Sequence, residues 1–133
     1  MNSLKDARIL IADDEGGMRN LLASIVKSNG YSDIEMASDG QKALDILRDT
    51  RRKFDIAMLD IDMPGFTGIE VMRMALALRP DCFFIIVSAH SGVENVKSAI
   101  SSGAKGFVVK PYNTSKIMDI LERYEREARL VKA

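Results

Sequence analysis

Short runs of apolar residues alternate along the chain with longer segments in which apolar residues recur at helical spacing. Most of the runs are apolar at nearly every position, which is typical of strands covered on both faces of a parallel sheet. The run at 34–37 instead alternates apolar and polar residues and suits the edge of a sheet. The pattern predicts strands at residues 9–12, 34–37, 54–59, 83–87 and 107–109.

Each run is followed by a helical pattern. The first has the stripe of an amphipathic helix, at Met18, Leu21, Leu22, Ile25 and Val26. Shorter stripes mark the second helix at 43–47 and the last at 117–128. The segments 67–70 and 91–94 have the residue spacing of a capping box, which predicts the starts of the third and fourth helices.

Five β-then-α units within 133 residues predict a single domain over 1–133, a doubly wound α/β fold with a five-stranded parallel sheet between two layers of helices. We take the strand order 2-1-3-4-5 from flavodoxin-like folds rather than from the sequence. Ligands of such folds bind beyond the carboxyl ends of the strands, where strands 1 and 3 diverge.

Charged and hydroxyl side chains stand where the predicted strands end. Strand 1 ends at Asp13-Asp14, strand 3 at Asp60, strand 4 at Ser88 and strand 5 at Lys110. Each alone has an ordinary explanation, such as a helix N-cap, a polar turn or a solvated lysine. Because parallel strands end at one edge of the sheet, the four positions together predict a site.

The residue types at this edge suit phosphoryl transfer. Neighbouring strands lie about 4.8 Å apart, so the carboxylates of strands 1 and 3 would repel one another unless a cation lay among them. Mg²⁺ prefers such oxygen ligands. Lys110 can reach Asp60 across strand 4, and Ser88 supplies a hydroxyl group. Metal, lysine and hydroxyl would offset the charge of a phosphoryl group while one aspartate attacks it.

These residues resemble the receiver domains of two-component response regulators over nearly the whole chain. The matching motifs are Asp13-Asp14-Glu15, Asp60 with Met63-Pro64-Gly65, Ser88-Ala89 and Lys110-Pro111. The resemblance implies a CheY-like, flavodoxin-like three-layer α/β/α fold. It also implies a signalling module rather than an enzyme. The only reactions of such a module are its own phosphorylation from a donor and its slow autodephosphorylation.

The resemblance implies a role for each acidic residue. Asp60 would be the phosphoacceptor and would take its phosphoryl group from a phosphohistidine on a sensor histidine kinase or a histidine phosphotransfer protein. Asp14, Asp60 and the backbone carbonyl of Asp62 would bind Mg²⁺ directly, and Asp13 would bind it through water. Asp62 and His90 occupy positions where the family tunes the lifetime of the phosphate. Whether Asp62 speeds or slows hydrolysis stays open, and His90 is expected at the pocket rim rather than as a catalytic base.

The resemblance also implies a readout. Lys110 and Ser88 would contact the phosphoryl oxygens, and the peptide bond before Pro111 would be cis. Phe107 would swing inward as Ser88 moves, which would switch the surface of helix 4, strand 5 and helix 5 for a partner or for dimerisation. The ordinary alternative for Phe107 is a core phenylalanine.

Bulk composition narrows the location and the partners. Nineteen basic residues balance nineteen acidic ones, so bulk charge favours neither nucleic acid nor a membrane surface. No run approaches the roughly 20 apolar residues of a spanning helix. The N-terminus lacks an apolar signal core, and the single Cys82 has no internal partner for a disulfide. We therefore expect a cytoplasmic protein.

Other functions fit less well. Asp60-Ile61-Asp62 could begin a haloacid-dehalogenase-type phosphatase motif, but Pro64 replaces its Thr or Val, and the motif would lie on the third strand rather than the first. A flavin module would need phosphate-binding groups after strand 1, where 13–15 is acidic. A docking module that no longer accepts phosphate would not need the complete residue set.

The final helix leaves one question open. Leu121, Tyr124, Ala128 and Val131 keep a 3-4-3 spacing, like the seam of a coiled coil. The helix could be the ordinary solvated end of a single-domain regulator that acts through a downstream protein. It could also be the start of a signalling helix that leads to a missing output domain.

Overall fold

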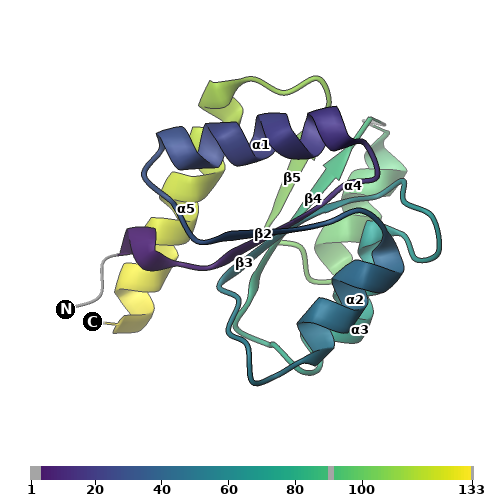
Figure 1. The fold of residues 1–133 in the computed structure, drawn as a ribbon, viewed down its shortest axis with the longest axis horizontal. Helices are drawn as coiled ribbons and strands as arrows, with labels where there is room; N and C mark the ends of the chain where they lie inside the picture. Colours follow the sequence, from purple (N-terminus) through teal and green to yellow (C-terminus); the bar gives the residue numbers. More distant parts are fainter. Residues whose placement is uncertain (1–3, 90–91, 133) are drawn as a thin grey trace.

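The protein folds into a parallel sheet between two layers of helices (Figure 1). The structure, a computed structural model, describes residues 4–89 and 92–132. Its strands are β1 (Ile9–Ala12), β2 (Ile34–Ala37), β3 (Ile56–Asp60), β4 (Phe83–Ser88) and β5 (Gly106–Val109). They pair in the order β2-β1-β3-β4-β5, so the expected order and the edge position of β2 are confirmed.

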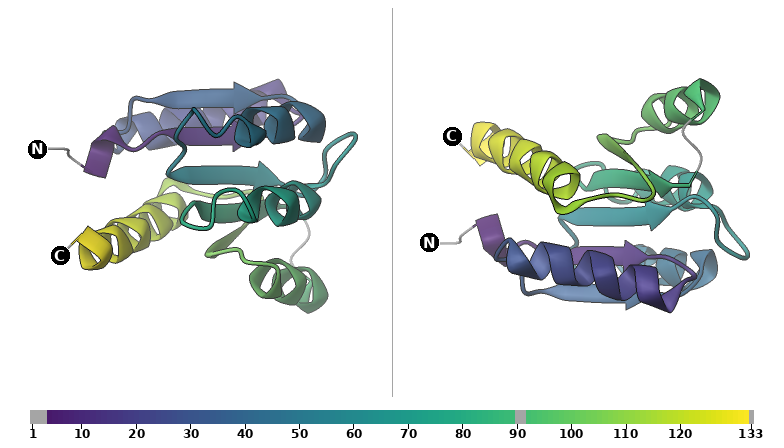
Figure 2. Two further views of the ribbon diagram at one scale, coloured as in Figure 1. Left: turned by 90° about the horizontal axis from the view of Figure 1, so that it is seen from below. Right: turned by 90° about the horizontal axis from the view of Figure 1, so that it is seen from above.

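The helices divide between the two faces of the sheet. They are α1 (Gly16–Ser28), α2 (Gly40–Arg48), α3 (Gly68–Leu76), α4 (Val93–Ser101) and α5 (Thr114–Lys132), and a short 3₁₀ turn, η1 (Leu4–Asp6), precedes β1. Helices α1 and α5 cover one face, and α2, α3 and α4 cover the other (Figures 1 and 2). Right-handed crossovers between parallel strands give this division.

Alternate residues of the central strands fill two apolar cores. Ile11, Met58 and Ile85 face α1 and α5, whereas their neighbours Leu10, Leu59 and Ile86 face α2 and α3. All of these side chains are almost completely buried, and each such burial contributes about 1.5–3 kcal/mol to stability. The two cores fix the register of the strands, because a shift of one residue would exchange the faces.

The start of β3 and the cap of α4 differ from the prediction. Strand β3 begins at Ile56 rather than at 54, because the Asp55 carboxylate accepts a hydrogen bond from the backbone N–H of Arg8 before the strand starts. The capping box at Thr67 is confirmed. The one predicted at 91–94 is wrong, because α4 has Gly92 as its N-cap residue, without a side-chain cap; Ser91 itself lies outside the described residues.

The seam of α5 faces the domain itself. Leu121 and Tyr124 are buried, and the Tyr124 ring meets that of Phe83 edge-on at 5.5 Å between centroids. Ala128 packs against the same core. At these positions the seam is part of the domain core, as an ordinary final helix requires. Within the described residues, no helix has the length and apolarity to cross a membrane.

Candidate functional site at the carboxyl ends of the strands

Four of the predicted site residues converge at one edge of the sheet. Asp13 follows β1 and Asp60 is the last residue of β3, with only 4% and 3% of their surfaces exposed. Ser88 ends β4 and is fully buried, and Lys110 follows β5. Parallel pairing of β1, β3, β4 and β5 aligns these ends, so the topology brings the residues together.

One lysine serves two buried carboxylates. The Lys110 Nζ atom lies 2.8 Å from Asp13 Oδ2 and 3.4 Å from Asp60 Oδ2. Burial alone would lower the pKa of Lys110, but its hydrogen bond to Asp13 and the charge of Asp60 outweigh burial and raise it. Lys110 is therefore a cation at neutral pH. The Lys110–Pro111 peptide bond is cis, the isomer that the resemblance implies.

The Asp60 carboxyl group is short of partners. Burial raises the pKa of Asp60 from 3.8 to about 6, the charge of Asp13 adds to this, and Lys110 opposes it. Its Oδ1 atom is buried and has no hydrogen-bond partner among the described residues. A buried acceptor without a donor is costly, so this oxygen suits a ligand that would complete it.

A second acidic group lies in the loop after β1. The carboxylates of Asp13, Asp14 and Glu15 lie within 4.8 Å of one another, with Asp13 buried and the other two exposed. Asp13 Oδ1 also accepts a hydrogen bond of 2.9 Å from the backbone N–H of Glu15. Such oxygen donors, with the orphaned Asp60 oxygen, fit Mg²⁺. Glu15 belongs to the matched motif, but no role in metal binding was predicted for it.

The remaining predicted residues surround this centre. Asp62 is exposed in the loop between β3 and α3, and its charge contributes to the raised pKa of Asp60. Phe107 is half-buried on β5 and packs against the core beneath α4. His90 lies outside the described residues.

Two further residues shape the site without being predicted for it. Gly68 opens α3 against the end of β3: a Cβ atom there would lie 2.4 Å from the backbone oxygen of Asp60. The sequence placed Gly68 only within a capping box, which carries no sign of this approach. Tyr112 follows the cis peptide bond, and its hydroxyl group donates to the Met18 carbonyl oxygen at 3.4 Å, linking the loop after β5 to α1.

Comparison with known protein families assigns the chain to one of them. The model of the response regulator receiver domain matches residues 9–122. The chain belongs to the response regulator receiver family. It is therefore a signalling module of two-component systems.

Individual relatives cover the receiver along almost its whole length. The chain is 33% identical over 119 residues to the chemotaxis protein CheY of Thermotoga maritima, covering 90% of this chain and 98% of that protein. It is 30% identical over 121 residues to the sporulation initiation phosphotransferase F of Bacillus subtilis, with 91% and 95% covered. The receiver is also similar to the solved CheX–CheY–BeF₃–Mg²⁺ complex of Borrelia burgdorferi, with a TM-score of 0.82, 30% identity, and 88% and 87% of the two chains covered.

Proposed function

We propose that this receiver, a single domain over 1–133, accepts a phosphoryl group on Asp60 from a phosphohistidine of a sensor histidine kinase or a histidine phosphotransfer protein. The observation that carries the proposal is the state of the Asp60 carboxylate. One of its oxygens lies near Lys110, whereas the other is buried and has no partner among the described residues. Such a carboxylate is held in place by Lys110 through one oxygen, while its other oxygen can still form a new bond.

The transfer itself needs one bond made and one bond broken. An oxygen of Asp60 forms the new P–O bond as the P–N bond of the donor breaks, and the donor imidazole leaves with the electron pair. Lys110 holds a positive charge beside the equatorial oxygens, and the Ser88 hydroxyl group can donate a hydrogen bond to one of them. Ser88 ends β4 and Lys110 directly follows β5, so the sheet holds both groups near Asp60.

Mg²⁺ is the metal that we propose for the site. Asp14, Asp60 and the backbone carbonyl of Asp62 would bind it directly, and Asp13 would bind it through water. When bound, the ion offsets negative charge on the phosphoryl oxygens. The clustered carboxylates of Asp13, Asp14 and Glu15 support this assignment.

The output would pass through the surface of α4, β5 and α5. Phosphorylation would draw Ser88 toward the phosphate and let Phe107 move inward. Ile100 on α4 and Met118 on α5 expose 50% and 38% of their surfaces, which supports an apolar contact with a downstream protein, an output domain or a second copy.

Incubation with acetyl phosphate and Mg²⁺, followed by intact mass spectrometry, tests the acceptor. The wild-type protein should gain about 80 Da, one phosphoryl group, and Asp60→Asn should gain nothing. Asp45→Asn, an aspartate on α2 that binds Gln41 instead, is the matched control and should be phosphorylated normally. An adduct that persists in Asp60→Asn would show that the acceptor is another residue.

A further inference from the structure

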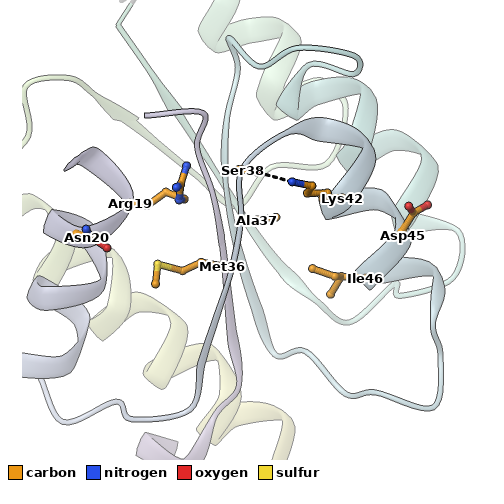
Figure 3. A pocket seen from close by; sticks show the side chains of 8 residues that line it. All are labelled: Arg19, Asn20, Met36, Ala37, Ser38, Lys42, Asp45 and Ile46. Atoms are coloured by element: carbon orange, nitrogen blue, oxygen red, sulfur yellow. Dashed lines mark hydrogen bonds between the residues drawn. The ribbon is translucent and has the colours of Figure 1, made fainter. Parts of the chain in front are cut away.

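Arg19 reaches from α1 back to the acidic loop. Its Nη1 atom donates a hydrogen bond of 2.6 Å to the backbone carbonyl oxygen of Asp13. Helical side chains lean toward the N-terminus of their helix, so a residue one turn into α1 can return to the loop before it. Figure 3 shows Arg19 beside the edge strand β2, where it lines a groove with Met36, Ser38 and Lys42.

With Arg19 included, each of the three oxygen atoms of Asp13 accepts a hydrogen bond. Oδ1 accepts from the Glu15 N–H group at 2.9 Å, and Oδ2 accepts from Lys110 at 2.8 Å. The carbonyl oxygen accepts from Arg19 at 2.6 Å. The carbonyl belongs to the peptide plane that joins Asp13 to Asp14. Fixing that plane therefore restricts the directions in which the chain can present Asp14.

Asp13 is also anchored to β2, since its N–H group donates a hydrogen bond of 3.2 Å to the Ala37 carbonyl oxygen. Beyond Asp13 the loop is held more weakly. Glu15 is the N-cap residue of α1, but its side chain makes no capping hydrogen bond in the described structure. The helix then opens with Gly16 and Gly17, and glycine loses more conformational freedom on folding than any other residue. The three neighbouring carboxylates also repel one another.

We propose that Arg19 is a positioning residue for the metal site: it holds the Asp13–Asp14 peptide in the orientation that presents both carboxylates to Mg²⁺. The inference rests on the proposed function in one respect, namely that Mg²⁺ binds at these aspartates. Residues that orient metal ligands in this way change metal affinity by about 10–100-fold when they are removed.

Titration calorimetry of the unphosphorylated protein with MgCl₂ tests this role. Arg19→Met should weaken Mg²⁺ binding about tenfold. Arg19→Lys, which keeps a donor on an arm of similar length, should recover most of the affinity. Arg73→Met is the matched control, because Arg73 lies on α3 and binds Ser102 instead. It should bind Mg²⁺ like the wild type.

The sign of the effect separates positioning from simple charge. If Arg19 acted only as a nearby positive charge, its removal would reduce repulsion and strengthen Mg²⁺ binding. Tighter or unchanged binding by Arg19→Met would therefore overturn the proposal, as would an equal loss in Arg73→Met.

A metal-free measurement keeps this test independent of the proposed function. Amide hydrogen exchange at Glu15, whose N–H group binds Asp13, should be faster in Arg19→Met than in the wild type or Arg73→Met. Unchanged exchange would refute the tether even in a protein that binds Mg²⁺. Faster exchange in a protein without detectable Mg²⁺ binding would support the tether and refute the metal site.

Discussion

The two ends of the sheet differ in how completely their charged side chains are paired. At the amino ends of the strands, Arg79 donates hydrogen bonds of 2.6–2.8 Å to three backbone carbonyls within 47–52. Its guanidinium group also stacks on the Phe54 ring, which Arg8 and Arg52 approach as well, all within 5.7 Å of the ring centre. The charge of Arg79 is thus well compensated, because its Nε and Nη2 atoms donate to these backbone carbonyls.

The same end holds a second satisfied cluster. Glu125 on α5 accepts hydrogen bonds from the Tyr31 hydroxyl at 2.8 Å and from Lys5 Nζ at 3.0 Å, which ties α5 to the 3₁₀ turn η1 beside it (Figure 2). At the carboxyl ends, Lys110 is shared by two buried carboxylates, and one oxygen of Asp60 has no partner among the described residues. Charged groups whose hydrogen bonds are all made within the protein stabilise the fold. A carboxylate with an unpaired oxygen can instead bind a ligand.

The largest expected effect lies at the amino end. Phe54→Ala should lower the free energy of unfolding by about 3–5 kcal/mol, because it removes a buried ring and leaves a cavity among three arginines. Urea denaturation measures the change. Phosphorylation per folded molecule should stay close to that of the wild type. A variant that stays stable yet loses phosphorylation would contradict the division between the two ends.

At the carboxyl end, removing a charge should stabilise the protein. The pKa of Asp60 is raised in the folded state, so its contribution to stability is full below 3.8 and is lost as the pH rises through about 6. Without Mg²⁺ at pH 7.5, Asp60→Asn should therefore be more stable than the wild type, on the order of 2–3 kcal/mol.

Acidification gives the matching control. The advantage of Asp60→Asn should shrink as the pH falls from 7.5 toward 4.5, because the wild-type carboxyl group then becomes neutral. Urea denaturation curves at four or five pH values would show it. An advantage that does not change with pH would mean that the charge of Asp60 is not the cause.

The smallest effect should have the opposite dependence on pH. Burial opposes ionisation of Glu125, but the hydrogen bonds from Tyr31 and Lys5 outweigh it and lower the pKa of Glu125 below its ordinary 4.5. Glu125→Gln should therefore cost about 1 kcal/mol at neutral pH. The difference from the wild type should fade as the pH falls below about 4.5. A cost that grows on acidification would contradict the pairing.

Periodicity was enough to predict the strands and the two helical layers, whereas the strand order came from flavodoxin-like folds. The central strands are apolar on both faces because helices cover both, and β2 alternates because it lies at an edge. The convergence of Asp13, Asp60, Ser88 and Lys110 follows from parallel topology alone. The start of β3 was misplaced because Phe54 was counted into the apolar run across the charged Asp55. Its ring packs among arginines before the strand begins.

The contacts that could not be predicted are those made with the backbone at the ends of the strands. The hydrogen bond from Arg19 to the Asp13 carbonyl depends on the orientation of α1 relative to β1. The spacing of apolar residues along the helix gives no information about that orientation. The approach of Gly68 to Asp60 likewise depends on the path of the loop between them. Glycine in a capping pattern looks the same whether or not another backbone lies against it.

The contact at Gly68 also has a mechanical meaning. The helix α3 and the last peptide of β3 touch through backbone atoms, with no side chain between them that could rotate. The N–H group of Gly68 also donates to the Ile61 carbonyl oxygen at 3.2 Å, which closes the loop onto the strand. Because no side chain separates them, we expect the start of α3 and the end of β3 to move together.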